Sequence, residues 1–236
     1  MIKLVENIIQ NIKKDDSYRI NSNFNTKQLF YILFYRTLQI FRGFLVFFKF
    51  NRISGLVFLG RHVVIEHGYQ IRSGKGLIIE DYVHINALSK LGIQLGDNVT
   101  ISKNTIIVCT GVISNIGEGI KIGNNVGINA MCFLGGQGYL EINDDVIIGP
   151  GVKIFTENHK YSSFENVIRK QGEIRKSVCI ERNCWIGAGS VILAGCNIGE
   201  GTVIAAGSVV TKNVPPNVVY GGIPAKFIKE RINEIE

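Results

Sequence analysis

The chain is poor in proline, with 4 residues in 236, although it contains 27 glycines. A Pro/Gly-rich linker is therefore excluded as the source of the glycines, and we expect them at repeated backbone positions. Charged residues make up only 19% of the chain and apolar residues 46%. This balance excludes a disordered chain and indicates a well-filled core. The length fits one extended domain with small additions at both ends.

Paired cysteines are also lacking. The five cysteines are odd in number, they form no CxxC pair, and no secretory signal is recognised before them. These features argue against a disulfide framework and against a zinc site. They predict reduced thiols in a cytoplasmic protein.

A six-residue repeat runs without a break from Ile180. Every sixth residue is a large aliphatic one: Ile180, Ile186, Ile192, Ile198, Ile204 and Val210. Three positions later stand glycine or asparagine: Asn183, Gly189, Gly195, Gly201, Gly207 and Asn213. One further on is a small or β-branched residue: Cys184, Ser190, Cys196, Thr202, Ser208 and Val214. Glycine and asparagine reach positive φ at low cost, so the chain can turn a corner every six residues.

This spacing predicts a parallel β-helix. The aliphatic residue points inward from a short strand, and the small residue fills the rest of a narrow core. Three sides make an 18-residue coil, and stacked coils hydrogen-bond as parallel strands about 4.8 Å apart. The pattern recurs upstream, as in Leu95–Val99, Ile122–Val126 and Ile142–Val146. Cys132 falls in the small inward slot, as do Cys184 and Cys196, so we interpret these cysteines as core residues.

The pattern divides the chain into three parts. Residues 1–55 form an N-terminal capping or membrane-surface segment, 56–215 the β-helix, and 216–236 a C-terminal tail with a short helix. Within the β-helix, the repeat disappears over residues 155–179, which are polar with a basic lean. Long excursions from a rigid scaffold commonly carry function.

The two ends carry the expected helical segments. Residues 28–50 are aromatic and apolar, but Arg36 and Arg42 lie near their middle, where charge in a membrane span is costly. A helix on a membrane surface and a helix that caps the open first coil remain equal alternatives. At the other end, Pro224 stands where a helix can begin, so AKFIKERINEIE is expected to be helical.

Several motifs identify a family resemblance. Asn158-His159, Trp185–Ser190, Val210–Pro216 and Gly221–Lys226 resemble the galactoside, maltose and xenobiotic acetyltransferases. The match covers most of residues 56–229. The resemblance implies a left-handed β-helix, a homotrimer with active sites between neighbouring subunits, and acetyl-CoA as the acetyl donor.

The resemblance places the family's catalytic base at His159. A sugar hydroxyl is barely ionised at neutral pH, and histidine is suited to take its proton and return it to the leaving thiolate. Asn158 is expected to orient the ring or bind substrate, and Asn129 matches a substrate-contacting asparagine by spacing. Ordinary alternatives are a loop histidine, a turn asparagine and an asparagine at a solenoid corner.

The expected acetyl-CoA site lies on the C-terminal coils. Gly187, Ala188, Ala205 and Ala206 are small and would leave a shallow groove for the pantetheine arm. Trp185 packs against that arm or simply covers the core. By resemblance, the nucleotide end of CoA contacts Thr211, Lys212, Lys226 and Lys229. Lysine is a good point-charge partner for phosphate, although each could be an ordinary solvated residue.

These observations predict an enzyme that acetylates a hydroxyl of a carbohydrate, such as a surface-polysaccharide precursor. An amino sugar is the nearest alternative acceptor, and a non-catalytic binding or structural solenoid is the alternative from another class. A metal hydratase needs three histidines grouped around zinc, and the four histidines of this chain supply no such group. The net charge of +7 is the only feature that favours nucleic acid, so no nucleic-acid partner is expected.

Overall fold

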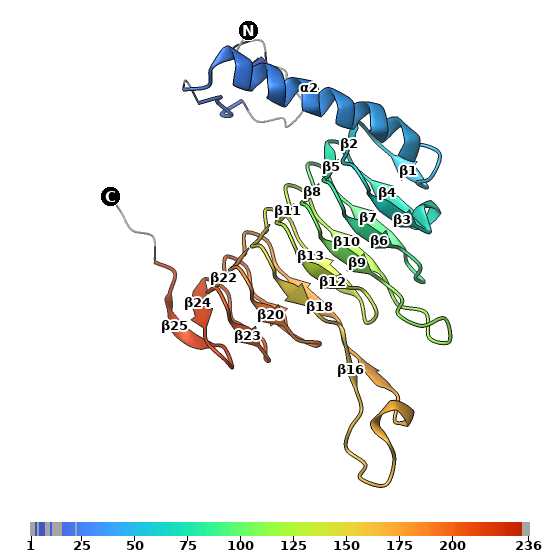
Figure 1. Cartoon of the computed structure of the whole chain (residues 1–236). Coiled ribbons are helices and arrows are strands. Elements are labelled where there is room, and N and C mark those ends of the chain that lie inside the picture. The colour runs from blue at the N-terminus through green and yellow to red at the C-terminus, as the bar shows by residue number, and fades with distance from the viewer. Residues whose placement is uncertain (1–2, 4, 8–9, 11–15, 22, 233–236) are drawn as a thin grey trace.

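The chain forms a long parallel β-helix with a helix laid across its first coils, as Figure 1 shows. This computed structural model describes the whole chain except residues 1–2, 4, 8–9, 11–15, 22 and 233–236. The helix and the C-terminal strands lie at opposite ends of the stack of coils. One hairpin projects away from the stack, between the two ends.

Three sheets form the sides of the β-helix. Sheet A contains, in order, β1 (Arg52–Ile53), β4 (Ile71–Ser73), β7 (Ile93–Leu95), β10 (Ile120–Ile122), β13 (Leu140–Ile142), β18 (Val178–Ile180) and β21 (Asn197–Ile198). Sheet B contains β2 (Val57–Leu59), β5 (Leu77–Ile79), β8 (Thr100–Ile101), β11 (Gly127–Ile128), β14 (Ile147–Ile148), β19 (Trp185–Ile186), β22 (Val203–Ile204), β24 (Val218–Gly221) and β25 (Lys226–Glu230). Sheet C contains β3 (Val64–Glu66), β6 (His84–Asn86), β9 (Ile106–Val108), β12 (Phe133–Gly135), β15 (Lys153–Ile154), β20 (Val191–Ile192) and β23 (Val209–Val210).

Each strand pairs with the equivalent strand of the next coil. Ile186 of β19, for example, lies in parallel register with Ile148 of the coil before and with Ile204 of the coil after. The large aliphatic residues of the repeat, Ile180 to Val210, are all buried in one continuous core. The small slots are buried as well, including Cys132, Cys184 and Cys196. The spacing therefore predicted the inward positions correctly.

The corners follow the glycine and asparagine column. Five of its six members have positive φ, between 56° and 89°: Asn183, Gly189, Gly195, Gly201 and Gly207. Asn213 is not among the residues with positive φ, so the expectation is wrong there. Its side-chain oxygen instead accepts a hydrogen bond from the Asn197 backbone N–H at 2.8 Å. An amide can close a corner with its side chain as well as with a left-handed backbone.

An N-terminal helix covers the open first coils. Helix α2 (Thr26–Gly43) begins with a capping box between Asn25 and Gln28 and continues into a 3-10 turn, η1 (Phe44–Val46). Arg42 donates from Nε to the Leu59 carbonyl at 2.9 Å, and the Tyr35 hydroxyl donates to Asp81 at 2.8 Å. These contacts hold α2 against the β-helix, so a capping helix is present within the segment where one was expected.

Glycine is required where the helix meets the first coil. A Cβ at Gly43 would lie only 1.9 Å from the backbone oxygen of Val57. Any larger side chain would therefore push the end of α2 away from β2. The sequence pattern did not show this requirement, because it arises only when the two elements are packed together.

The expected C-terminal helix is wrong over the described residues. Residues 226–230 form β25, which pairs antiparallel with β24, and residues 233–236 lie outside the described chain. β24 is the last parallel strand of sheet B and would otherwise leave a row of backbone groups unpaired. Pairing with β25 satisfies them, and this tertiary gain overrides the helix propensity of the lysines and glutamates.

The core can be tested with a matched pair of isoleucines. Ile186 is fully buried, whereas Ile147, which lies on the neighbouring strand, is 55% exposed. Ile186→Ala should lower the free energy of unfolding by about 2–5 kcal/mol, because it removes buried methyl groups and leaves a cavity in a narrow core. Ile147→Ala should change it by less than about 1 kcal/mol. Denaturant unfolding measures both, and equal losses would contradict the inward and outward assignment.

Candidate active site

The excursion from the β-helix is a hairpin at the corner between sheets C and A. Strand β16 (Glu157–His159) pairs antiparallel with β17 (Glu173–Arg175), and a 3-10 turn, η3 (Ile168–Lys170), lies between them. In Figure 1 the hairpin projects from the side of the β-helix near β18. His159 pairs with Glu173 and Asn158 with Ile174. Both His159 and Asn158 are exposed, so neither side chain is used to fill the core.

The base of the hairpin is held firmly. Thr156, just before β16, is fully buried, and its hydroxyl donates to the Gly135 carbonyl at 3.0 Å. The same hydroxyl accepts from the Gly138 backbone N–H at 2.9 Å, while the Thr156 carbonyl accepts from the Lys176 backbone N–H. Thr156 thus joins the start and the end of the hairpin to the adjacent coil. His159 stands only three residues from this anchor.

Arg175 braces the hairpin against a second insertion, the loop between β9 and β10. Its Nε donates to Glu157 at 2.7 Å, and its two terminal nitrogens donate to the carbonyls of Ile116 and Asn115 at 2.8 and 2.7 Å. Its side chain is only 15% exposed, and Arg is well suited to hold several acceptors in a fixed plane. In the sequence, Arg175 stands out only as one of the basic residues of segment 155–179. No spacing links it to Asn115, which lies 60 residues away.

A second group of expected site residues lies at the corner between sheets B and C. Asn129, Gly187 and Ala205 occupy equivalent corner positions on different coils, each donating a backbone hydrogen bond to the next coil. The Asn129 side-chain amide also donates to the Ile148 carbonyl at 2.9 Å. Ala188 and Ala206 follow at the same corner and are exposed. We call this group the alanine corner: Asn129, Gly187, Ala188, Ala205 and Ala206.

The stacking of the coils is enough to explain why residue 187 is glycine. It is buried, and a Cβ there would lie 2.5 Å from the Ala206 backbone nitrogen. Close stacking of the coils therefore requires glycine at this position whether or not a ligand binds. Ala188 and Ala206 are the members of the alanine corner that present small side chains to the surface. Trp185 is exposed on sheet B, between Ile147 and Val203.

The expected phosphate-binding residues lie on the last coils. Thr211 and Lys212 follow β23 at the corner that leaves sheet C, and both are exposed. Lys226 and Lys229 are exposed on β25, opposite Gly221 and Val219. The fold thus gathers these four residues at the C-terminal end of the β-helix, although Thr211 and Lys212 stand at a different corner from the alanine corner.

The structure separates the expected site into two halves. His159 and Asn158 lie at the corner between sheets C and A, whereas the alanine corner lies at the corner between sheets B and C. The strands of sheet C lie between these two corners. Among the described residues there is no group of three or more His, Cys, Asp or Glu side chains that could hold a metal ion.

Two family models match the repeats. The model for the bacterial transferase hexapeptide (six repeats) matches residues 180–212, and that for the hexapeptide repeat of succinyl-transferase matches residues 76–109. Both matches lie within the β-helix, on either side of the hairpin.

Curated proteins with similar sequences include acetyltransferases. Galactoside O-acetyltransferase of Lactococcus lactis is 38% identical over 119 residues, which are 50% of this chain and 56% of that protein. Galactoside O-acetyltransferase of Escherichia coli is 38% identical over 115 residues, 48% of this chain and 55% of that protein. Protein CapG of Staphylococcus aureus is 41% identical over 122 residues, 47% of this chain and 66% of that protein. The chain spans about half the length of the galactoside O-acetyltransferases that it matches.

A solved structure shows the same fold. An N-acyltransferase from Bacillus cereus, in complex with dTDP-4-amino-4,6-dideoxyglucose and coenzyme A, has a TM-score of 0.54 and 18% identity. The similarity covers 82% of this chain and 91% of that one. Together with the parallel strands, it supports the left-handed β-helix expected from the sequence. This chain therefore carries hexapeptide repeats and is similar in sequence, over about half of its length, to galactoside O-acetyltransferases.

Proposed function

We propose that this protein transfers an acetyl group from acetyl-CoA to a hydroxyl of a sugar or surface-polysaccharide precursor, with His159 as general base. The observation that carries the proposal is an exposed imidazole on a hairpin whose base is anchored by Thr156 and Arg175. An exposed side chain on a firmly held strand is what general-base catalysis needs. The similarity to galactoside O-acetyltransferases supports acetyl transfer and favours a hydroxyl over an amine.

The proposed reaction is a direct displacement. The His159 imidazole accepts the hydroxyl proton while the oxygen attacks the thioester carbon. The carbon–sulfur bond then breaks, and the imidazolium returns its proton to the leaving thiolate. Backbone amides stabilise the charge on the intermediate oxygen. The products are the acetylated sugar and free CoA.

The cysteines favour direct attack over an acetyl-cysteine intermediate. Burial raises the pKa of Cys109 to about 12 and that of Cys184 to about 11. At neutral pH these thiols stay protonated and are poor nucleophiles. The other three cysteines have raised pKa values for the same reason, desolvation.

The separation of the two halves supports a site shared between copies of the chain. Within one chain, His159 and the alanine corner lie at opposite ends of the strands of sheet C. We propose a homotrimer in which the hairpin of one chain faces the alanine corner of its neighbour. The pantetheine arm would lie along Ala188 and Ala206, beside Trp185, with the substrate near Asn129 and Asn158. The phosphates would meet Thr211, Lys212, Lys226 and Lys229. Acetyl-CoA as donor is consistent with a cytoplasmic location.

An amino sugar is the second candidate acceptor. The B. cereus N-acyltransferase was solved with an amino sugar nucleotide, but its similarity concerns the fold alone. A screen with matched acceptors that differ only in a hydroxyl or an amine, detecting released thiol, separates the two. Turnover with the hydroxyl acceptors supports the proposal, and turnover with amines alone would overturn the choice of acceptor.

His159→Ala should lower kcat by about two to four orders of magnitude, because the hydroxyl loses its proton acceptor. The affinity for CoA, measured by calorimetry, should stay within about twofold. His62→Ala is the matched control, since His62 lies in the first coils and stacks on Tyr82. Near-normal turnover of His159→Ala would remove the assigned base.

Arg175→Ala should lower kcat by about tenfold or more while CoA affinity is retained, because the hairpin loses its brace and His159 its fixed position. Arg175→Lys should recover only part of the loss, since lysine cannot hold three acceptors in one plane. Arg182→Ala, which removes a surface ion pair with Glu200, is the control. Equal kcat in Arg175→Ala and the wild type would show that the brace does not matter for catalysis.

Binding of CoA should weaken with added salt, because its phosphates are held by lysines. The double variant Lys212→Ala/Lys226→Ala should bind CoA about tenfold more weakly and show a smaller salt dependence. Lys103→Ala, an exposed lysine outside the proposed site, should bind as the wild type does. Calorimetry at two salt concentrations measures all three. If wild-type protein binds no CoA, the assignment of the donor is wrong.

A further inference from the structure

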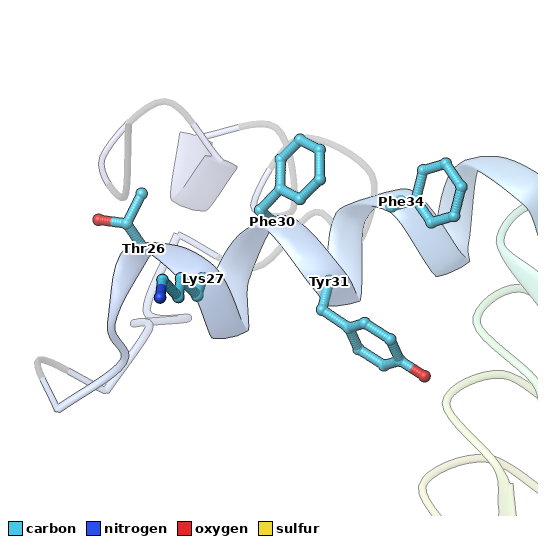
Figure 2. A pocket seen from close by; sticks show the side chains of 5 residues that line it. All are labelled: Thr26, Lys27, Phe30, Tyr31 and Phe34. Carbon is cyan, nitrogen blue, oxygen red and sulfur yellow. The ribbon is translucent and has the colours of Figure 1, made fainter.

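Helix α2 and the turn after it expose a stripe of large apolar side chains. Phe30, Phe34, Phe41, Leu45 and Phe48, which we call the aromatic stripe, are between 56% and 96% exposed. Their spacings of four, seven, four and three residues keep them on one side of the helix. The rings of Phe30 and Phe34 stack with centroids 6.4 Å apart, and Figure 2 shows both projecting from the same side of α2. With Thr26, Lys27 and Tyr31 they line an open hollow.

The other side of the helix makes the contacts with the β-helix. Gln39, Gly43 and Val46 are buried there, and Arg42 donates to the Leu59 carbonyl from the same side. Arg36 also turns inward, where its guanidinium lies 5.9 Å from the Phe58 ring centre. The aromatic stripe therefore points away from the β-helix. Burial in the core of this chain does not account for it.

The net positive charge of the chain is concentrated in the segment that carries this stripe. Residues 17–65 contain seven lysines and arginines and no Asp or Glu, so they alone carry the whole net charge of +7. The rest of the chain has nineteen basic and nineteen acidic residues. Arg19 and Arg61 pair with Glu6 and Asp81. The other basic residues of the segment form no ion pair within the described chain: Lys27, Arg36, Arg42, Lys49 and Arg52.

We propose that α2 and the turn that follows dock the protein on the surface of an anionic lipid bilayer. The aromatic stripe would enter the boundary between headgroups and acyl chains, while Lys27 and Lys49, both exposed near the two ends of the stripe, contact acidic headgroups. Aromatic rings on one side of a helix, with basic residues near its ends, are typical of interfacial binding. The proposal is independent of the acetyltransferase proposal.

A membrane span is disfavoured by the same contacts. Residues Thr26–Val46 are long and apolar enough to cross a bilayer by length and composition. A span would have to bury Arg36 and Arg42 in hydrocarbon and break the bonds from Arg42 to Leu59 and from Tyr35 to Asp81. Lying flat on the surface retains all of them.

Charge also distinguishes the bilayer from a second copy of this chain. Two copies meeting through their aromatic stripes would bring two uncompensated basic segments together, and like charges repel. An anionic surface meets the same segment with the opposite sign. We therefore assign the stripe to lipid, and self-association becomes an outcome that the experiment can show.

The test is co-sedimentation of the full chain with vesicles of phosphatidylcholine alone, or with about one third phosphatidylserine. The wild type should bind the anionic vesicles at least about tenfold more tightly, and added salt should weaken this binding. Phe41→Ser/Phe48→Ser should bind at least about tenfold more weakly, because two rings no longer enter the interface. Lys27→Glu/Lys49→Glu should lose a similar amount.

Two controls make the result specific. Phe164→Ser removes another fully exposed phenylalanine, on the hairpin, and Lys103→Glu/Lys170→Glu reverses two exposed lysines outside residues 17–65. Neither should change binding, and unfolding curves should show every variant folded. The proposal is overturned if wild-type protein does not bind anionic vesicles or if the controls lose binding equally. It is also overturned if bound protein resists alkaline extraction, as a span would, or if only self-association changes in Phe41→Ser/Phe48→Ser.

Discussion

Backbone hydrogen bonds between successive coils hold this structure together. A single coil has no partner for the N–H and C=O groups of its three short strands, and its aliphatic side chains fill only one layer of the core. Stacking satisfies both needs at once, as the column Ile148, Ile186 and Ile204 shows in sheet B. The first and last coils then need covers, and α2 and β25 provide them with quite different secondary structure.

The stacked coils also give a rigid base from which an exposed side chain can be held far from the core. The hairpin leaves the β-helix where the repeat is interrupted, and its base is tied to the adjacent coil through Thr156 and to a second insertion through Arg175. His159 is thus exposed without being loosely held. One chain supplies this imidazole at one corner of sheet C and the alanine corner at the other. The proposed site, completed by neighbouring copies, rests on that division.

The sequence predicted the parts of the fold that depend on local spacing. The inward position of Ile186, the small slot at Cys184 and the left-handed corner at Gly189 all follow from a six-residue period. The failures lie where two distant segments meet. Residues 226–230 have the composition of a helix but pair with β24, and Asn213 closes its corner with a side chain. His159 and the other site residues were assigned through motifs, and their roles stay predictions. Arg175 was not, since its partners Asn115 and Ile116 are brought close only by folding.

We propose that an imidazole from one chain meets a thioester held by its neighbour. A crystal structure of the protein with CoA tests it most directly, through the distance between the His159 ring nitrogen and the CoA sulfur. We expect a trimer in which that distance is within about 4 Å, across the interface from Ala188 and Ala206 of the neighbouring chain. A sulfur bound far from every copy of His159, or CoA bound at another face of the β-helix, would contradict it.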